Sequence, residues 1–235
     1  MPSSKSARTA DADVSNVEPY PFRPEHFRRQ DESEDANFYT VPRLVTHIDD
    51  AAIAAARSFY GVQLPVGGQI LDLMSSWVSH LPDPVEYASV AGLGMNAPEL
   101  GANPRLTERV VQDLNANPTL PWQPETFDGA IVTVSVQYLT RPVEVFAEVG
   151  RVLKPGAPFI VTFSNRCFPT KAVAIWQMMG DRDHAQLVGM YARHSGAFAP
   201  AEAFDLSPNP GRSDPMFAVM ARSLPLDERR PPRLE

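Results

Sequence analysis

The chain has 235 residues, a formal net charge of −7 at pH 7 and a sequence pI near 5.3. This length suits one α/β domain with extensions rather than two domains. The excess of acidic residues argues against a surface that binds nucleic acid or anionic membranes in general. The single cysteine, Cys167, rules out an intrachain disulfide and is typical of a reducing compartment, so we expect a cytoplasmic protein.

Composition divides the chain into three expected parts. Residues 1–36 are rich in Ser, Pro, Asp, Glu and Arg and are expected to form a disordered or loosely packed arm. The exception within the arm is an aromatic cluster that would attach it to the body, Tyr20, Phe22 and Phe27. Residues 37–223 are expected to form the folded domain, and residues 224–235 a polar, proline-broken tail. No apolar run approaches the roughly 20 residues that span a bilayer.

The predicted elements alternate between helix and strand. Asp49 and Asp50 precede an Ala-rich helix, where the macrodipole favours acidic residues, and Gly61 is expected to end it. Later helices are expected at 76–81, from Asn96, from Pro142 and at 170–193 with a break near Gly180. The expected strands are 69–74, 86–93, 109–114, 129–136, 159–163, 203–206 and 216–221.

The stretch from residue 127 to 163 is the most informative part of the chain. Residues 129–136 form an uninterrupted β-branched and apolar run, which suits a strand buried on both faces of a parallel sheet. A helix with one apolar face follows from Pro142, and a Lys-Pro-Gly turn ending at Gly156 stops it before the next strand. This order is a βαβ unit, so the fold class is α/β.

The string EVGRVLKPGAPFIVTF, residues 148–163, resembles a segment of class I S-adenosylmethionine-dependent methyltransferases, particularly the type 11 group. FDGAIV, residues 127–132, resembles the strand that precedes it in that family, and the match extends back to about residue 68. The resemblance implies a Rossmann-like, doubly wound, seven-stranded sheet that is mostly parallel with an antiparallel last strand. It also implies S-adenosyl-L-methionine as the cofactor.

The first strand end departs from the family pattern. Asp72 occupies the family's acidic position, but residues 74–77 read Met-Ser-Ser-Trp where the family has a glycine-rich loop. Ser75 and Ser76 could offer hydroxyl and amide donors to the cofactor's carboxylate. The alternative is that Ser76 only caps a short helix.

The next strand ends supply the other expected cofactor residues. Gly94 stands where the family has the acid that grips the ribose, and Met95 and Asn96 follow it; Asn96 either contacts the ribose or only caps a helix. Asp113 matches the aspartate that accepts from the adenine amino group, unless it is a solvated loop residue. Two further cofactor residues are implied by the resemblance, Leu114 and Ser135.

Residues near the sheet edge are candidates for the acceptor side: Tyr39, Gln137, Tyr138, Asn165 and Arg166. Tyr138 could instead be ordinary core, and Arg166 either holds a carboxylate or phosphate or pairs on the surface. The candidate bases are His47 and His80, although most lone histidines are surface or packing residues. The five histidines show no metal-ligand spacing, so no metal is expected.

The favoured function is methyl transfer from S-adenosylmethionine to a small-molecule acceptor, with neither nucleic acid nor membrane as partner. The alternative is a catalytically inactive methyltransferase-like binding or scaffold protein, which the missing glycines and Gly94 support. A dinucleotide-dependent oxidoreductase is disfavoured because the chain has no GxGxxG followed by an acidic residue.

Overall fold

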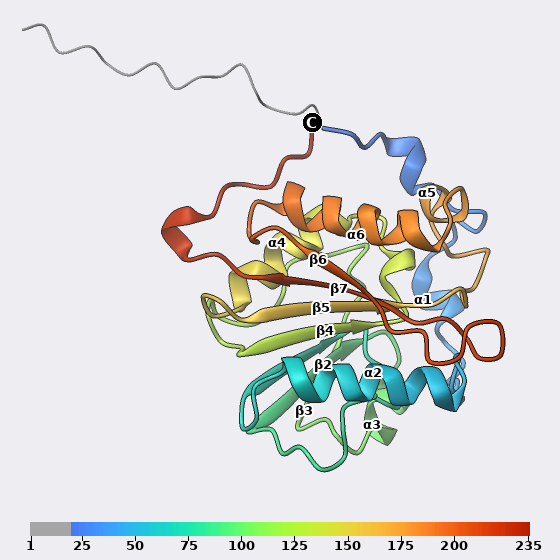
Figure 1. Cartoon of the computed structure of the whole chain (residues 1–235). Coiled ribbons are helices and arrows are strands. Elements are labelled where there is room, and N and C mark those ends of the chain that lie inside the picture. The colour runs from blue at the N-terminus through green and yellow to red at the C-terminus, as the bar shows by residue number, and fades with distance from the viewer. Residues whose placement is uncertain (1–19) are drawn as a thin grey trace, which may run out of the picture.

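The computed structural model describes residues 20–235, in which a seven-stranded sheet lies between two layers of helices (Figure 1). The strand order is β3-β2-β1-β4-β5-β7-β6. All neighbouring pairs are parallel except those of β7, which runs antiparallel to both β5 and β6. The strands are β1 (Gln69–Leu73), β2 (Ser89–Gly94), β3 (Glu108–Val111), β4 (Gly129–Thr133), β5 (Pro158–Phe163), β6 (Glu202–Asp205) and β7 (Phe217–Arg222). The expected α/β sheet with an antiparallel last strand is confirmed.

Helices cover both faces of the sheet, with α2 and α3 on one side and α4 and α6 on the other (Figure 1). The helices are α1 (Asp35–Phe38), α2 (Asp50–Gln63), α3 (Ala97–Ala102), α4 (Pro142–Val152), α5 (Ala174–Gln177) and α6 (Asp181–Ser195). Short 3-10 turns lie at Pro24–Phe27, Val136–Tyr138 and Leu226–Glu228. The helix expected over 170–193 is therefore two helices, separated near Gly180 as its broken periodicity predicts.

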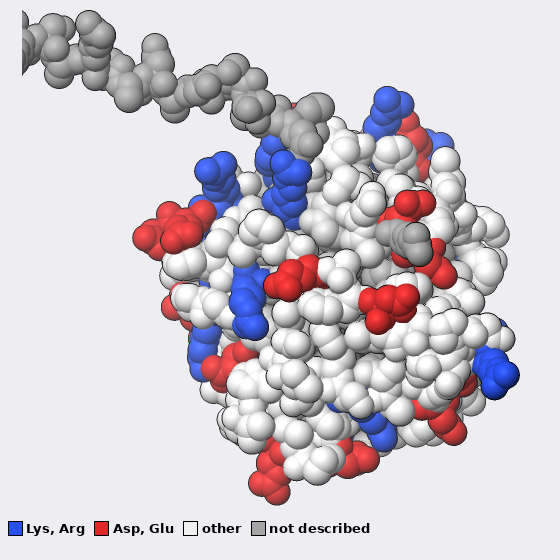
Figure 2. Space-filling model, in the orientation of Figure 1, with Lys and Arg blue, Asp and Glu red and all other residues white. Residues whose placement is uncertain are grey.

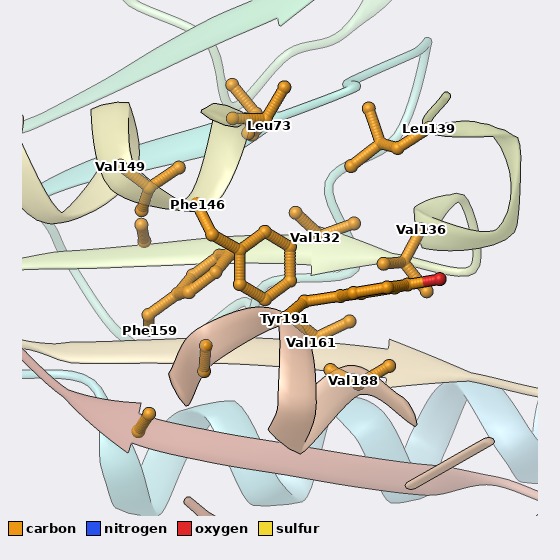
Figure 3. Close-up of a cluster of buried hydrophobic side chains, with 14 of the residues drawn as sticks. Leu73, Val132, Val136, Leu139, Phe146, Val149, Phe159, Val161, Val188 and Tyr191 are labelled. Carbon is orange, nitrogen blue, oxygen red and sulfur yellow. The ribbon is translucent and has the colours of Figure 1, made fainter. Parts of the chain in front are cut away.

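The larger part of the core lies under α4 and α6. Phe146 of α4 packs edge-on against Phe159 of β5, with ring centroids 4.9 Å apart, and against Tyr191 of α6 at 5.8 Å. Figure 3 shows these rings meeting aliphatic side chains of the sheet, among them Val132 and Val161. Fully burying each such side chain contributes about 1.5–3 kcal/mol, so this face anchors the strands whose ends form the site.

On the other face, Tyr60 of α2 connects the helix to the sheet. It is fully buried, and its hydroxyl lies 2.8 Å from Thr133 Oγ1 and 2.7 Å from Thr162 Oγ1. The expectation that Gly61 ends this helix is wrong, because α2 continues to Gln63. The helix ends where Leu64 takes an extended backbone (ψ 141°), as the residue before a proline must.

The helix expected at 76–81 is also wrong, because this segment is an irregular loop. Met74 and His80 both have left-handed backbones, with φ of 56° and 52°, which a continuous helix does not allow. The Asn103 side-chain amide donates to Ser76 O and to Ser79 Oγ, each at 2.9 Å. These bonds tie the loop to the C-terminal end of α3, where Asn103 is the C-cap residue.

Both ends of the described chain pack against α6. Phe22 is buried, with its ring 5.3 Å from that of Tyr191, so the aromatic cluster does attach residues 20–36 to the domain. The part of the expected arm at 1–19 lies outside the described residues. In the tail, the backbone N–H of Arg230 donates to Gly196 O at 3.0 Å. The tail is thus in contact with the domain, while the boundaries at 36 and 223 stay predictions.

The charged side chains on the face in Figure 2 are interspersed, with acidic and basic groups lying near one another rather than in one continuous area of either sign. Over residues 20–235, no helix combines the length and apolar character needed to cross a membrane.

Candidate active site

A cavity of about 300 Å³ opens at the carboxyl ends of β1, β2, β3 and β4. This is the edge of the sheet where doubly wound folds bind ligands, and the volume is at the lower end of the range for small-molecule sites. The segment from Tyr39 to Ile48 forms the opposite wall, together with Phe168. Most of the candidate residues from the sequence line the cavity, namely Tyr39, His47, Asp72, Ser75, Ser76, His80, Met95, Asn96, Asp113, Leu114, Ser135, Tyr138 and Arg166.

The loop after β1 is folded onto the end of β2. The backbone N–H of Ser75 donates to Leu93 O at 2.7 Å, and its hydroxyl donates to Asp72 Oδ2 at 2.6 Å. Burial raises the pKa of Asp72 to about 7, although hydrogen bonds from Ser75 and Ser79 oppose the shift. The carboxyl group of Asp72 therefore holds this loop in place while being only partly ionised at neutral pH.

Gly94, at the end of β2, makes room for this loop. A Cβ atom at this position would lie 2.1 Å from the backbone oxygen of Ser75, far inside van der Waals contact. The two departures from the family pattern, the missing glycines after β1 and the missing acid after β2, therefore depend on each other. The loop occupies the space that a side chain at position 94 would need.

The hydroxyl of Ser76 is bound to protein. It donates to Glu99 Oε2 at 2.6 Å, while Glu99 Oε1 accepts from the backbone N–H of Arg43 at 2.7 Å. With the Ser75 hydroxyl on Asp72, neither serine hydroxyl is free to donate to a ligand in this arrangement. The helix-capping alternative for Ser76 fails as well, because no helix starts there.

Asn96 caps α3. The sequence left two interpretations of this residue open, a helix cap and a contact with the ribose. Its Oδ1 accepts from the backbone N–H of Glu99 at 3.0 Å, and its Nδ2 donates to Tyr39 O at 2.8 Å. Both ends of the amide are therefore used within the protein. Asn96 fixes the segment at Tyr39 above the cavity.

The loop after β3 is organised by Asp113 and Asn115. Asp113 Oδ1 accepts from the backbone N–H of Asn115 at 2.8 Å, which orients the carboxylate at the cavity wall. The Asn115 amide donates to Asp35 Oδ2 at 2.8 Å and to Tyr138 O at 3.0 Å. Asn115 thus links β3, β4 and the N-terminal segment, although the sequence predicted only Asp113 and Leu114 on this loop.

A buried ion cluster holds the N-terminal segment in place. Asp35 accepts from Arg29 Nη1 at 2.7 Å and lies 3.2 Å from the Nζ of Lys171, whose side chain is fully buried. Burial alone would raise the pKa of Asp35, but the hydrogen bonds from Arg29 and Asn115 outweigh it and hold that pKa below its usual value. Asp35 therefore stays ionised and keeps this segment over the cavity.

The end of β4 carries backbone strain and an unpartnered hydroxyl. Val134 has φ 51°, which is a genuine outlier for a β-branched residue. The next residue, Ser135, lines the cavity, and its Oγ is buried with no hydrogen-bond partner among the described residues. Strained backbone and unsatisfied polar atoms concentrate at functional sites, so a ligand that satisfies Ser135 Oγ is a physical expectation here.

The acceptor-side candidates divide into residues that line the cavity and residues that do not. Gln137 is buried and donates to Val134 O at 3.0 Å, and Asn165 is exposed; neither of these two candidates lines the cavity. Tyr138 lines it, but its hydroxyl accepts from the backbone N–H of Phe168 and burial raises its pKa to about 12. Arg166 forms an ion pair with Asp214 at 2.8 Å. Pairing on the surface was the alternative to holding a carboxylate or phosphate of the substrate.

Both candidate bases line the cavity. Burial, aided by the charge of Arg57, lowers the pKa of His80 to about 4, and its Nδ1 is buried with no partner among residues 20–235. Burial and the charge of Arg43 lower the pKa of His47 from its ordinary value, and its ring lies edge-on to Phe168 at 5.1 Å. Both imidazoles are neutral at pH 7 and able to accept a proton. Within the described residues, no group of three or more His, Cys, Asp or Glu is placed to hold a metal ion.

Comparison with protein families gives a match for residues 76–161 to a family model described as a methyltransferase domain. A segment of 78 residues is 36% identical to the methyltransferase phqN of Penicillium fellutanum and covers 31% of this chain and 24% of that protein. The chain spans a quarter or less of the length of the curated relatives that it matches.

Solved structures share the fold at low identity. Geranyl diphosphate C-methyltransferase from Streptomyces coelicolor A3(2), in complex with Mg²⁺, geranyl diphosphate and S-adenosyl-L-homocysteine, gives a TM-score of 0.55 at 13% identity, over 80% of this chain and 97% of that chain. The cyclase SpnF gives a TM-score of 0.54 at 14% identity, over 80% and 91% of the two chains. Since one neighbour is a methyltransferase and the other a cyclase, the fold does not by itself specify the reaction.

Proposed function

Because the chain carries a methyltransferase domain of the class I, S-adenosylmethionine-dependent type, we propose that it transfers a methyl group from S-adenosylmethionine to a small-molecule acceptor. The observation that carries this proposal is the cavity at the carboxyl ends of β1 to β4. Its wall combines the carboxylate of Asp113 with the unpartnered hydroxyl of Ser135.

Two arguments indicate that the cavity residues fit the cofactor. The first is the resemblance to the family, and the second is the chemistry of the side chains. Asp113 would accept from the adenine amino group, and Leu114 and Met95 would contact the adenosine moiety. The Ser135 hydroxyl would gain its missing partner. When bound, S-adenosylmethionine supplies an electrophilic methyl group on a sulfonium.

On the acceptor side, the protein's task is to align the nucleophile and exclude water. The segment from Tyr39 to Ile48 closes over the cavity and performs both roles. Where the acceptor carries a proton, His47 takes it on a ring nitrogen. His47 is the better base of the two histidines, since the pKa of about 4 makes His80 a weak one.

Calorimetric titration with S-adenosylmethionine and S-adenosylhomocysteine tests the proposal. We expect both to bind, and Asp113→Ala to weaken binding several-fold without loss of fold. Glu202→Ala, on the exposed edge strand β6, is the matched control and leaves the affinity unchanged. Absence of binding at millimolar ligand would refute the enzyme and favour the inactive binding or scaffold protein.

The alternative of an inactive binding or scaffold protein is favoured by the hydroxyls of Ser75 and Ser76, because both are bonded to other protein groups. Incubating the protein with a cell extract and methyl-labelled cofactor separates the two candidates. Cofactor binding without any labelled small-molecule product supports the binding protein, and a labelled product supports the enzyme.

We place the reaction in the cytoplasm, since a chain with one cysteine is typical of a reducing compartment.

A further inference from the structure

We infer that the acceptor is a small molecule bearing a carboxylate, and that Arg43 binds this group. The inference rests on the proposed function, because it concerns the acceptor half of the same cavity. Arg43 lies on the segment that closes over the cavity, and its side chain is one of the lining groups.

The guanidinium of Arg43 lacks an ionic partner in the part of the chain that the structure describes. It forms no ion pair within residues 20–235, and its Nη1 is buried without a hydrogen-bond partner there. Among the guanidinium's bonds to the described part of the chain, there is only the one from Nη2, which donates to Phe38 O at 3.0 Å. The other arginine that lines the cavity, Arg166, is already paired with Asp214. Since an unsatisfied buried donor is costly, this arginine is the cation that remains available to an anion.

The surroundings of Arg43 favour a carboxylate over water. Its Cζ lies 4.5 Å from the centroid of the Phe38 ring and 5.5 Å from that of Phe168. The rings hold the guanidinium by cation–π contact and remove solvent from it, which strengthens its attraction to an anion. A guanidinium also matches the planar geometry of a carboxylate better than an ammonium does.

The position of Arg43 beside the proposed base favours the acceptor as the bearer of the carboxylate. Its guanidinium lies among Phe38, Tyr39 and Phe168, and its charge acts on His47, the proposed base. The cofactor's own carboxylate is expected at the loop after β1, at Ser75 and Ser76, whose hydroxyls are bonded to Asp72 and Glu99.

The test uses the full chain saturated with S-adenosylhomocysteine and pairs of ligands that differ only in charge. The probes are acetate, benzoate and 4-hydroxyphenylacetate, each compared with its primary amide by NMR titration. We expect at least one carboxylate to bind the wild type about tenfold more tightly than its amide. In Arg43→Met this preference is lost, and in Arg43→Lys it is partly kept. Arg212→Met, at an exposed arginine, is the matched control and keeps the preference.

Three results would overturn the inference. The first is that no carboxylate is preferred by the wild type, and the second is that the preference survives in Arg43→Met. The third is that Arg43→Met weakens S-adenosylhomocysteine but not 5′-methylthioadenosine, which lacks the amino-acid carboxylate; this would assign Arg43 to the cofactor. Failure of the wild type to bind S-adenosylhomocysteine at all would instead contradict the proposed function, so the two failures are distinguishable.

Discussion

Replacing Gly94 by aspartate would restore the acid that the methyltransferase family places after the second strand, and we expect it to damage this protein. The Cβ atom of any residue at this position would lie 2.1 Å from Ser75 O and 3.2 Å from Leu100 Cδ2. The first contact is with backbone, so the loop after β1 would have to move by more than an ångström.

The magnitude follows from what this movement breaks. Ser75 would lose its backbone hydrogen bond to Leu93 and its side-chain bond to Asp72. Overpacking of a buried site costs about 1–3 kcal/mol, and a buried polar group left without its partner costs about 1–3 kcal/mol more. We therefore expect the free energy of unfolding to fall by roughly 2–6 kcal/mol in Gly94→Asp, and by a similar amount in Gly94→Ala.

Urea denaturation measures the free energy of unfolding, and calorimetric titration with S-adenosylhomocysteine measures the affinity of the site for the ligand. Gly101→Ala is the control, because a Cβ there meets nothing within 4 Å and the residue lies in helix α3. We expect that control to be as stable as the wild type or slightly more so. Gly94→Asp with unchanged stability and tighter ligand binding would refute the reasoning, since the acid would then fit beside the loop.

Three further perturbations test the groups around the cavity. Asp72 has a native pKa of about 7 against 3.8 unfolded, so the native state binds more protons between these values and stability falls as pH rises through them. About two of these units lie between pH 5 and pH 8, which corresponds to a loss of about 3 kcal/mol, and urea denaturation of Asp72→Asn at these two pH values should show this loss abolished; an unchanged pH dependence would contradict the assignment. Lys171→Met leaves Asp35 with one cation fewer and should cost about 3 kcal/mol or more, with faster proteolysis at residues 20–40; equal proteolysis rates would show that the cluster does not hold the segment. Tyr60→Phe removes hydrogen bonds to two threonines and should cost about 1–3 kcal/mol in thermal or urea unfolding, whereas an unaltered midpoint would show those bonds to contribute nothing.

Several site residues were predictable because the chain order of a βαβ fold places them at one edge. Asp72 lies near the end of β1, Asp113 and Ser135 follow β3 and β4, and parallel strands bring their carboxyl ends together. Gln137 and Asn165 follow strands too, yet they lie outside the cavity lining. Position in the chain therefore indicates the edge of the sheet but not the direction of a side chain.

The sequence alone determined the strands, the position of α4 and the class of the fold, because these depend on local periodicity and on short stop signals such as Gly156. The irregular loop at 74–80 was decided by tertiary structure, since its path depends on the fit of Ser75 against Gly94, nineteen positions away. The same holds for Asp35, whose partner Lys171 is distant in the chain. Close packing and buried charge pairing join residues far apart in sequence, and local patterns carry no signal for such contacts.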